Sequence, residues 1–551
     1  MTMKRRQFVK LTTTASAAGL LPIQLNASFK FLNNNFNCDF SNRKIVLIDL
    51  QGGNDGLNTI IPLSVYSDYV NMRPNIHIPS SLALPLNNID SSLLGTNQDI
   101  ALHPALSGIH NLFNQDQLRI IQSVGYPSAN KSHFASIDIY STGNDGNNWN
   151  NGQDNGWIGR FMENHYSDLI PSSFPLGIQI GSRNTSLGFH GENEHGLAMN
   201  LSGQDSENFY SVLSGLSGEY PLSFPDSHYG NELQYIVDTD AFSNTYAQAI
   251  SNSFNNGNNF SGANYPDSDL SNQLKTVARL IRGGIQTKVY LVRIGGFDTH
   301  NDQVQGEGDI LGTHYNLLNE LSTSIEAFMT DINSDSIGDD IVGITISEFG
   351  RKVQENGSFG TDHGEVAPVF VFGKPVKSGI SGVNVDLSEA SDDNNYQIET
   401  VQFDYRQAIA TLMQDFLAAD DQDINNTFLE NTTNASFVES KVENLLKSSY
   451  VVPESCLNQN LGLNESSKNN WIVFPNPFKD FINIKSVAGN YEEKIAYQIT
   501  NQFGQIIFKG KLNLDNFQTK LNLTSLNTGV YILTIKSTKQ NQSYKLIKVA
   551  T

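Results

Sequence analysis

Apolar and polar residues alternate along the chain on two different scales. Short, continuous apolar runs are separated by longer segments in which apolar residues recur every three or four positions. The first pattern is typical of strands that are buried on both faces, and the second of amphipathic helices. The apolar runs occupy residues 44–50, 118–124, 288–294, 340–346 and 369–373, and the clearest helical segments are residues 271–283 and 314–332. This alternation predicts an α/β domain over residues 43–451, built on a mainly parallel sheet.

Acidic residues and histidines gather near the ends of these apolar runs. Ligands bind beyond the carboxyl ends of parallel strands, so side chains that follow the runs are expected to share one edge of the sheet. Carboxylates and imidazoles are the usual ligands of divalent metals such as Zn and Mn. The residues in this position are Asp49, Asp298, His300, Glu348, Asp362 and His363. Each alone is also consistent with a helix cap or a loop hydrogen bond, but the set predicts a divalent metal site (Zn, Mn or Ca).

A serine-rich segment lies between the first of these residues and the later ones. Ser132 stands at the start of an expected helix. Beside a divalent metal its hydroxyl could act as a nucleophile, because the metal lowers the pKa of the hydroxyl and the helix dipole favours the anion. Ser128 precedes the same helix and is the second choice. The alternative is that Ser132 only caps the helix.

The first residues of the chain follow a different pattern. Arg5 and Arg6 precede an apolar residue and a lysine, and a mildly hydrophobic stretch leads to a small-residue cleavage motif at residues 25–27. This order predicts a twin-arginine signal peptide over residues 1–27 and export by the twin-arginine translocase. A basic start to an ordinary helix is the alternative.

The C-terminal part of the chain changes character again. A polar linker over residues 457–470 leads into short segments of period two that continue to residue 551, which predicts a small β-sandwich over residues 471–551. Its motifs FPNPF, NQFGQIIF, LNLTSLNTGVYILTI and YKLIKV resemble the C-terminal sorting domain of the type IX secretion system of Bacteroidetes. The resemblance implies an address read by the type IX secretion machinery, and a protein that reaches the cell surface or the medium. A carbohydrate-binding or immunoglobulin-like accessory domain is the alternative.

The central region also resembles a known family. The motifs GGNDGLNTIIPL, ALHPAL, KSHFASID, GGFDTH, SEFGR and GTDHGEVAPVFVFG, in this order over residues 45–446, resemble the DUF1501 family of exported bacterial proteins. That family is similar to the alkaline phosphatase and sulfatase superfamily, which implies an α/β/α sandwich with metals at the strand ends. By this resemblance Ser132 falls near the nucleophile position. The implied metal ligands are Asp49, Asp298, His300, Glu348 and His363.

The sequence departs from the superfamily pattern at the expected metal site. Phe349 stands where a second histidine is expected after Glu348, so one metal is expected rather than two. The leading hypothesis is an exported metal-dependent hydrolase of phosphate, sulfate or related esters. In it Arg351 could hold the anionic group bidentately, or it could equally be a surface salt-bridge residue. One alternative is a non-catalytic cell-surface protein that keeps the fold and binds a glycan or a partner. Another is a carbohydrate-active enzyme with paired carboxylates, which would need two carboxyls facing a groove.

The composition of the chain bears on nucleic-acid binding, membrane insertion and disulfide formation. With 35 Lys and Arg against 56 Asp and Glu, the formal net charge is −21, which argues against a nucleic-acid groove. No apolar run of membrane-spanning length follows the N-terminal segment, so no stable membrane span is expected. Cys38 and Cys456 flank the central region and could pair after export, but nothing in the sequence requires it.

Overall fold

The computed structural model divides the chain into two compact units, residues 1–459 and residues 460–551. It describes residues 38–86, 99–147, 149, 154–170, 172–181, 187–192, 198–201, 245–429, 437–457, 471–474, 478–486, 495–501, 506–512, 518–527, 529–536 and 541–548. The predicted signal peptide, residues 1–27, and residues 458–470 of the predicted linker lie outside the described residues. Among the helices that are described, none combines the length and the hydropathy of a membrane span.

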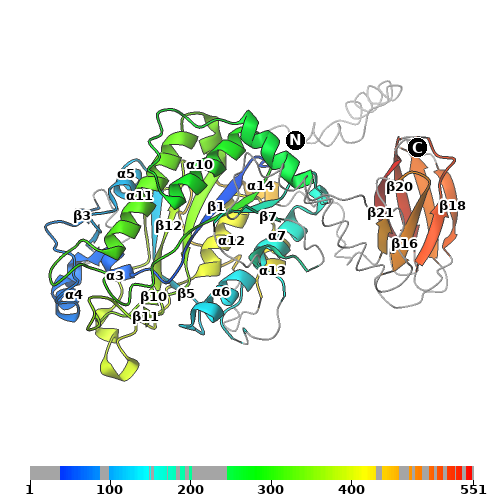
Figure 1. Ribbon diagram of the computed structural model, residues 1–551. Coiled ribbons are helices and arrows are strands. Elements are labelled where there is room, and N and C mark those ends of the chain that lie inside the picture. The colour runs from blue at the N-terminus through cyan, green and yellow to red at the C-terminus, as the bar shows by residue number, and fades with distance from the viewer. Residues whose placement is uncertain are drawn as a thin grey trace, which may run out of the picture. The chain divides into compact units, whose positions relative to one another are not determined.

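A nine-stranded sheet forms the centre of the first unit (Figure 1). Its strand order is β13-β5-β12-β9-β1-β8-β6-β7, with β14 beside β5. The strands are β1 (Lys44–Leu50), β5 (Leu118–Gly125), β6 (Gly177–Gln179), β7 (Ala198–Asn200), β8 (Val289–Ile294), β9 (Ile341–Ser347), β12 (Ala367–Phe372), β13 (Gly379–Ser381) and β14 (Phe403–Asp404). β12 is antiparallel to both β5 and β9, whereas the other pairs are parallel. The predicted mainly parallel sheet is therefore confirmed, with the apolar run at residues 369–373 forming the antiparallel strand.

Helices follow the strands in the order that the apolar periodicity predicts. Those that cover the sheet are α5 (Ser107–Asn114), α6 (His133–Thr142), α7 (Trp157–His165), α10 (Asp269–Arg282), α11 (Thr313–Ile332), α12 (Tyr405–Asp415) and α13 (Asp421–Thr427). The two helices predicted at residues 271–283 and 314–332 correspond to α10 and α11. A smaller layer beside the sheet contains α3 (Gly56–Thr59), β2 (Ile60–Pro62), α4 (Tyr66–Met72), β3 (Leu84–Pro85) and β4 (Ile100–Leu102).

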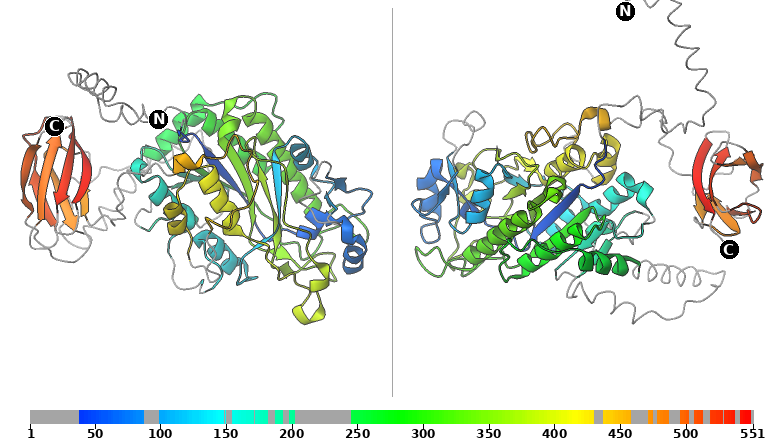
Figure 2. Two further views of the ribbon diagram at one scale, coloured as in Figure 1. Left: turned by 180° about the vertical axis from the view of Figure 1, so that it is seen from behind. Right: turned by 90° about the horizontal axis from the view of Figure 1, so that it is seen from above.

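The side chains of β1 alternate between two hydrophobic cores. Val46, Ile48 and Leu50 belong to one core, and Ile45 and Leu47 to the other. All seven residues of β1 are buried, which requires a covering layer on each face of the sheet. α10 and α11 cover the first face, α7 and α12 cover the second, and β1 lies between the two layers in the right-hand view of Figure 2. The first unit is thus the α/β/α sandwich that was expected.

A disulfide joins the two cysteines of the chain. Cys38 and Cys456 are bonded with their Cα atoms 5.6 Å apart, across a sequence separation of 418 residues. Cys456 lies on the short helix α14 (Glu454–Leu457). The pairing that the sequence left open is therefore present, and it closes the central unit near both of its ends.

The second unit is an all-β structure with its own core. A three-stranded sheet, β15-β16-β19, and a four-stranded sheet, β18-β17-β20-β21, are both antiparallel. The strands are β15 (Trp471–Phe474), β16 (Phe481–Ser486), β17 (Ile495–Asn501), β18 (Ile506–Leu512), β19 (Gln518–Asn522), β20 (Gly529–Lys536) and β21 (Asn541–Lys548). Inward residues of both sheets, such as Ile484 and Leu533, share one hydrophobic cluster. This confirms the β-sandwich that the period-two pattern predicts.

Candidate metal centre

Three histidines and one aspartate meet at the carboxyl edge of the central sheet. Asp298 and His300 lie in the loop that follows β8. His363 lies on β11 (His363–Gly364), which pairs with β10 (Gly350–Arg351). His133 is the first residue of α6. Three of the predicted ligands, Asp298, His300 and His363, are thus brought together, with His133 as a fourth member.

The three imidazoles face the carboxylate of Asp298 through the same ring nitrogen. The Nε2 atoms of His300 and His363 each lie 3.1 Å from Oδ1 of Asp298. Nε2 of His133 lies 3.4 Å from Oδ2 of the same carboxylate. The side chains of Asp298 and His300 are 44% and 42% exposed, so the centre is accessible from solvent.

The other ring nitrogen of each histidine has an acceptor beside it. The three contacts are Nδ1 of His133 with Oε2 of Glu348 at 2.7 Å, Nδ1 of His363 with the carbonyl oxygen of Lys131 at 2.7 Å, and Nδ1 of His300 with Oδ1 of Asp362 at 3.2 Å. An ionised carboxylate or a carbonyl can only accept a hydrogen bond, so the tautomer that donates to these three acceptors carries its proton on Nδ1. In the neutral imidazole each Nε2 then presents a lone pair to the centre.

This arrangement fits a bound divalent metal. Ligand atoms of His133, Asp298 and His363 all lie within 4.8 Å of one another. Ligands bonded to Zn at about 2.0–2.2 Å lie roughly 3–4 Å apart, so small movements would bring these atoms around one ion. The Nε2 atoms of His300 and His363 are 2.9 Å apart, and their lone pairs face each other unless a proton or a cation lies between them. An acceptor behind each imidazole is also the usual arrangement around metal-bound histidines.

The electrostatics of Asp298 and His363 favour the protonation states that bind metals. Burial raises the pKa of Asp298, but the hydrogen bond and the charge of Arg351 outweigh it and lower the pKa to about 2. Burial lowers the pKa of His363, which favours the neutral imidazole. An ionised carboxylate and a neutral imidazole are the forms that coordinate a metal.

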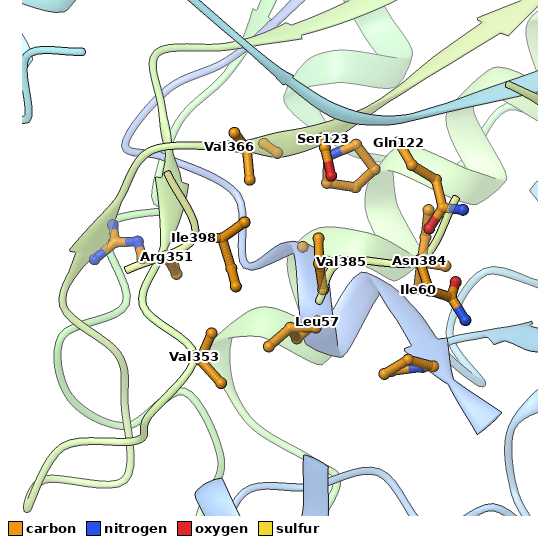
Figure 3. Close-up of a pocket in the computed structure, with 14 residues that line it drawn as sticks. Leu57, Ile60, Gln122, Ser123, Arg351, Val353, Val366, Asn384, Val385 and Ile398 are labelled. Atoms are coloured by element: carbon orange, nitrogen blue, oxygen red, sulfur yellow. The ribbon is translucent and has the colours of Figure 1, made fainter. Parts of the chain in front are cut away.

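Arg351 supports the carboxylate of Asp298 from inside the protein. Its Nη2 donates to Oδ1 of Asp298 at 2.7 Å, and its Nε and Nη1 donate to the carbonyl oxygens of Gly53 and Thr361 at 2.9 Å each. The side chain has no exposed area. Figure 3 shows the guanidinium pointing away from the apolar side chains of a neighbouring cavity, among them Leu57. From the sequence, Arg351 could hold a substrate anion or form a salt bridge. It forms a salt bridge with Asp298 from inside the protein, and this placement makes it a residue that orients Asp298.

The loop that carries Asp298 packs on the glycine-rich turn after β1. Gly52 has a φ of +114°, and a Cβ atom at this position would lie 2.3 Å from the backbone nitrogen of Asp298. Glycine alone combines this backbone conformation with so close an approach. The turn at Gly52 therefore helps to position the carboxylate.

Glu348 and Asp49, two further predicted ligands, lie on the side of the α6 and α7 layer. Glu348 reaches the centre through its contact with His133. Oδ2 of Asp49 lies 3.5 Å from Nε of Arg293 and accepts a hydrogen bond from Gln51 at 3.2 Å. Both carboxylates line one cavity of about 50 Å³ between the sheet and these helices. Neither belongs to the converging group among the described residues, so their role as metal ligands stays a prediction.

Ser132 is the N-cap residue of α6, and it is exposed. Its side chain makes no capping hydrogen bond with the first turn. Both of its neighbours touch the centre, since the carbonyl of Lys131 accepts from His363 and the ring of His133 faces Asp298. Ser132 thus stands beside the centre at the positive end of a helix dipole. Its role as a nucleophile stays a prediction.

Phe349 covers one side of the centre with an apolar ring. The centroid of this ring lies 5.0 Å from that of His133 and 4.4 Å from that of His363. A phenyl ring cannot coordinate a metal, so this side of the imidazoles offers no ligand. Within the described ranges, the converging donors suit a single ion.

The candidate ligand that the sequence analysis did not include is His133. It follows no apolar run directly, because a turn separates it from the end of β5 at Gly125. Its position in the sequence could have indicated this role. His133 comes directly after Ser132 at the start of a helix, and this helix follows the carboxyl end of a strand. Such a helix start lies at the same sheet edge as the strand-end loops.

Comparisons with known proteins agree with the two resemblances found in the sequence. The family described as "Protein of unknown function (DUF1501)" matches residues 257–423, and the family described as "Secretion system C-terminal sorting domain" matches residues 472–549. A comparison with functionally curated proteins finds no match. The second unit thus carries a secretion sorting domain, which indicates export across the outer membrane.

Some of the solved structures similar to this chain are an alkaline phosphatase superfamily protein and sulfatases. One is a superfamily protein from Vibrio parahaemolyticus, 8% identical, covering 91% of this chain and 78% of that chain with a TM-score of 0.27. Another is the PsFucS1 sulfatase from Pseudoalteromonas sp., 10% identical, covering 92% and 88% with a TM-score of 0.29. A third is BT33494S-sulf of Bacteroides thetaiotaomicron, 7% identical, covering 85% and 89% with a TM-score of 0.31. These similarities are too loose to transfer an activity.

Proposed function

We propose that this protein is an exported, metal-dependent hydrolase of phosphate, sulfate or related esters. The observation that carries the proposal is the common orientation of three imidazoles. His133, His300 and His363 each bond an acceptor through Nδ1 and direct Nε2 at the carboxylate of Asp298. This preorganised set of nitrogen and oxygen donors is suited to Zn or Mn, whereas Ca, which prefers oxygen ligands, fits it less well.

The residues around the centre suggest how an ester would be cleaved. A divalent cation held there would polarise the ester and neutralise charge that develops on its oxygens. In this proposal the hydroxyl oxygen of Ser132, at the start of α6, bonds to the phosphorus or sulfur atom as the bond to the ester oxygen breaks. The serine proton passes to solvent and the departing oxygen takes up a proton. Water then cleaves the serine ester and restores the hydroxyl.

The test combines metal analysis with activity on simple substrates. The purified, tag-free protein should contain close to one equivalent of a divalent metal, and should hydrolyse an aryl phosphate or an aryl sulfate. His363→Ala should remove both the metal and the activity, whereas His110→Ala, on the outer side of α5, should change neither. A protein that neither contains nor binds a divalent metal would contradict the proposal.

A non-catalytic binding protein that keeps this fold is the second candidate. It is favoured by the placement of Arg351, whose guanidinium is fully engaged inside the protein, and by Phe349, which packs on His133 and His363 and stands where a second histidine was expected from the sequence. A metal-loaded protein that binds anionic esters without turning them over would support this candidate.

The paired-carboxylate enzyme considered from the sequence is less well supported. Asp49 and Glu348 do line a common cavity, but its volume of about 50 Å³ is small. Ligand pockets usually measure about 300–1,000 Å³, so this cavity suits a few water molecules rather than a sugar ring.

A further inference from the structure

The second unit of the chain carries a charge opposite to that of the rest. Residues 460–551 contain 11 lysines, no arginine and 5 acidic residues, which gives a formal charge of +6. Because the whole chain has a net charge of −21, the other residues together carry −27. The sorting domain is therefore a cationic unit on a strongly acidic protein, and such an asymmetry steers association towards negative surfaces.

The alternation of buried residues identifies the outward face of the four-stranded sheet. On β20, Leu533 and Ile535 are buried in the sandwich, whereas Ile532 and Lys536 are exposed. Alternate residues of a strand point to opposite faces, so Ile532 and Lys536 share the outward face. On the neighbouring β17, the buried Ile499 marks the inward face in the same way.

The pairing register arranges the outward residues of three strands in rows. From one end of the sheet to the other, the rows across β18, β17 and β20 are Ile506–Thr500–Ile532, Lys509–Gln498–Thr534 and Lys511–Ala496–Lys536. Ile506 and Ile532 are 52% and 43% exposed, and the three lysines are exposed. Acidic residues are absent from these described positions. We call this set of nine residues the lysine face.

The other sheet provides a contrast. Its exposed lysine on β19, Lys520, has its ammonium group 3.5 Å from the centroid of the Phe481 ring. The positive charge of Lys520 is therefore engaged in a cation–π contact within its own sheet. On the lysine face, Lys536 makes a long hydrogen bond of 3.4 Å to the neutral Gln498, and its lysines and isoleucines are exposed to solvent.

We propose that the lysine face docks onto an acidic protein surface of the outer-membrane secretion machinery. The exposed isoleucines offer apolar area to bury, as the central part of a protein interface does. The lysines add a positive potential that selects and orients an acidic partner. The partner is taken to be the secretion machinery because residues 472–549 match a secretion sorting domain. This inference does not depend on the hydrolase activity.

The test compares two charge reversals in the full chain, expressed in a bacterium that exports it. Lys511→Glu with Lys536→Glu reverses the cationic end of the face. Lys479→Glu with Lys520→Glu makes the same change in net charge at exposed positions of the other sheet and its leading turn. The exported fraction should fall about ten-fold or more for the first pair, because like charges placed together across an interface repel strongly, and stay within about two-fold for the second.

Further variants assign the cause of the loss. Lys511→Arg with Lys536→Arg should export normally, and Ile506→Ser with Ile532→Ser should also reduce export. Melting curves of the purified full-length variants should match that of the original protein, since every changed side chain is exposed.

Three results would overturn the proposal. Normal export of the Lys511→Glu, Lys536→Glu variant would exclude the face as a docking surface. Equal loss in both charge-reversal pairs would assign the effect to net charge alone. Binding of the purified protein to vesicles of anionic outer-membrane glycolipid that is lost in the same variant would assign the face to lipid rather than to an acidic protein.

Discussion

Two Asp–Arg pairs follow glycine-rich turns at the ends of neighbouring strands, and they have different surroundings. Asp55, after β1, contacts Arg73 at 2.6 Å, and both side chains are fully buried. Asp298, after β8, contacts Arg351 at 2.7 Å, but the aspartate is 44% exposed. Their local sequences, GGND and GGFD, are nearly the same. The difference therefore comes from what the rest of the fold places around each carboxylate.

Around Asp55 the fold places only internal partners. Its Oδ2 also accepts a hydrogen bond from Gln303 at 2.6 Å, and the pKa of Asp55 is lowered because the charge and hydrogen bond of Arg73 outweigh burial. Around Asp298 the fold places three imidazoles that present their Nε2 atoms. A carboxylate enclosed by internal donors serves the structure, whereas one that is exposed beside three imidazole nitrogens can bind a ligand.

The largest change in stability is expected at the buried pair. Asp55→Ala leaves Arg73 charged, buried and without its carboxylate, which should lower the free energy of unfolding of the first unit by about 3–5 kcal/mol. Denaturant unfolding measures this loss. Metal content per folded molecule should stay unchanged, and a loss of metal without a loss of stability would contradict the distinction between the two pairs.

The largest change in metal binding is expected at the exposed pair. Asp298→Ala removes the carboxylate that all three imidazoles face, so metal affinity should fall by more than the roughly 10–100-fold expected for loss of an outer partner. Competition with a chelator measures the affinity. The matched control is Glu307→Ala, an exposed acidic residue in the same long loop, which should leave the affinity unchanged.

A smaller effect is expected one contact away from the centre. Glu348→Gln keeps an oxygen that can accept from Nδ1 of His133 but removes its charge, so metal affinity should fall by about 10–100-fold without loss of the fold. Glu348→Ala should lower it further. If the glutamine variant instead lost all metal, Glu348 would be a direct ligand, as the sequence predicted.

The smallest effect on stability is expected at Ser132. Its side chain makes no capping hydrogen bond, so Ser132→Ala should cost less than the about 0.5–2 kcal/mol of a working N-cap. If Ser132 is the nucleophile, the same variant should abolish ester hydrolysis while metal content and melting temperature stay the same. Full activity in the variant would exclude Ser132 and direct attention to Ser128.

The fold was largely predictable because its signal is local. The apolar run at residues 44–50 became β1 with the same bounds, and the periodic segment at residues 314–332 became α11 with one added residue. Burial of a strand on both faces or of one helix stripe leaves a direct trace in the order of residues. The direction of β12 leaves no such trace, because an antiparallel strand buried on both faces has the same composition as a parallel one.

The site was predictable only in part, because its geometry depends on contacts between distant segments. Asp298 and His363 could be chosen from their places beside apolar strands. His133 could not, since its part in the centre requires α6 to begin beside β11, where His363 contacts the carbonyl of Lys131. The burial of Arg351 could not be predicted from the sequence either. Its guanidinium is held by carbonyl groups from three separate loops, and only the folded chain brings these loops together.

The disulfide between Cys38 and Cys456 closes the chain of the central unit into a covalent ring. Any single proteolytic cut between the two cysteines would leave one molecule of unchanged apparent mass, which separates into two fragments only after reduction. A cut between Cys456 and the sorting domain, by contrast, would release that domain and leave the ring intact. Since such bonds form and persist in oxidising compartments, the state of this ring also records that the chain has left the cytoplasm.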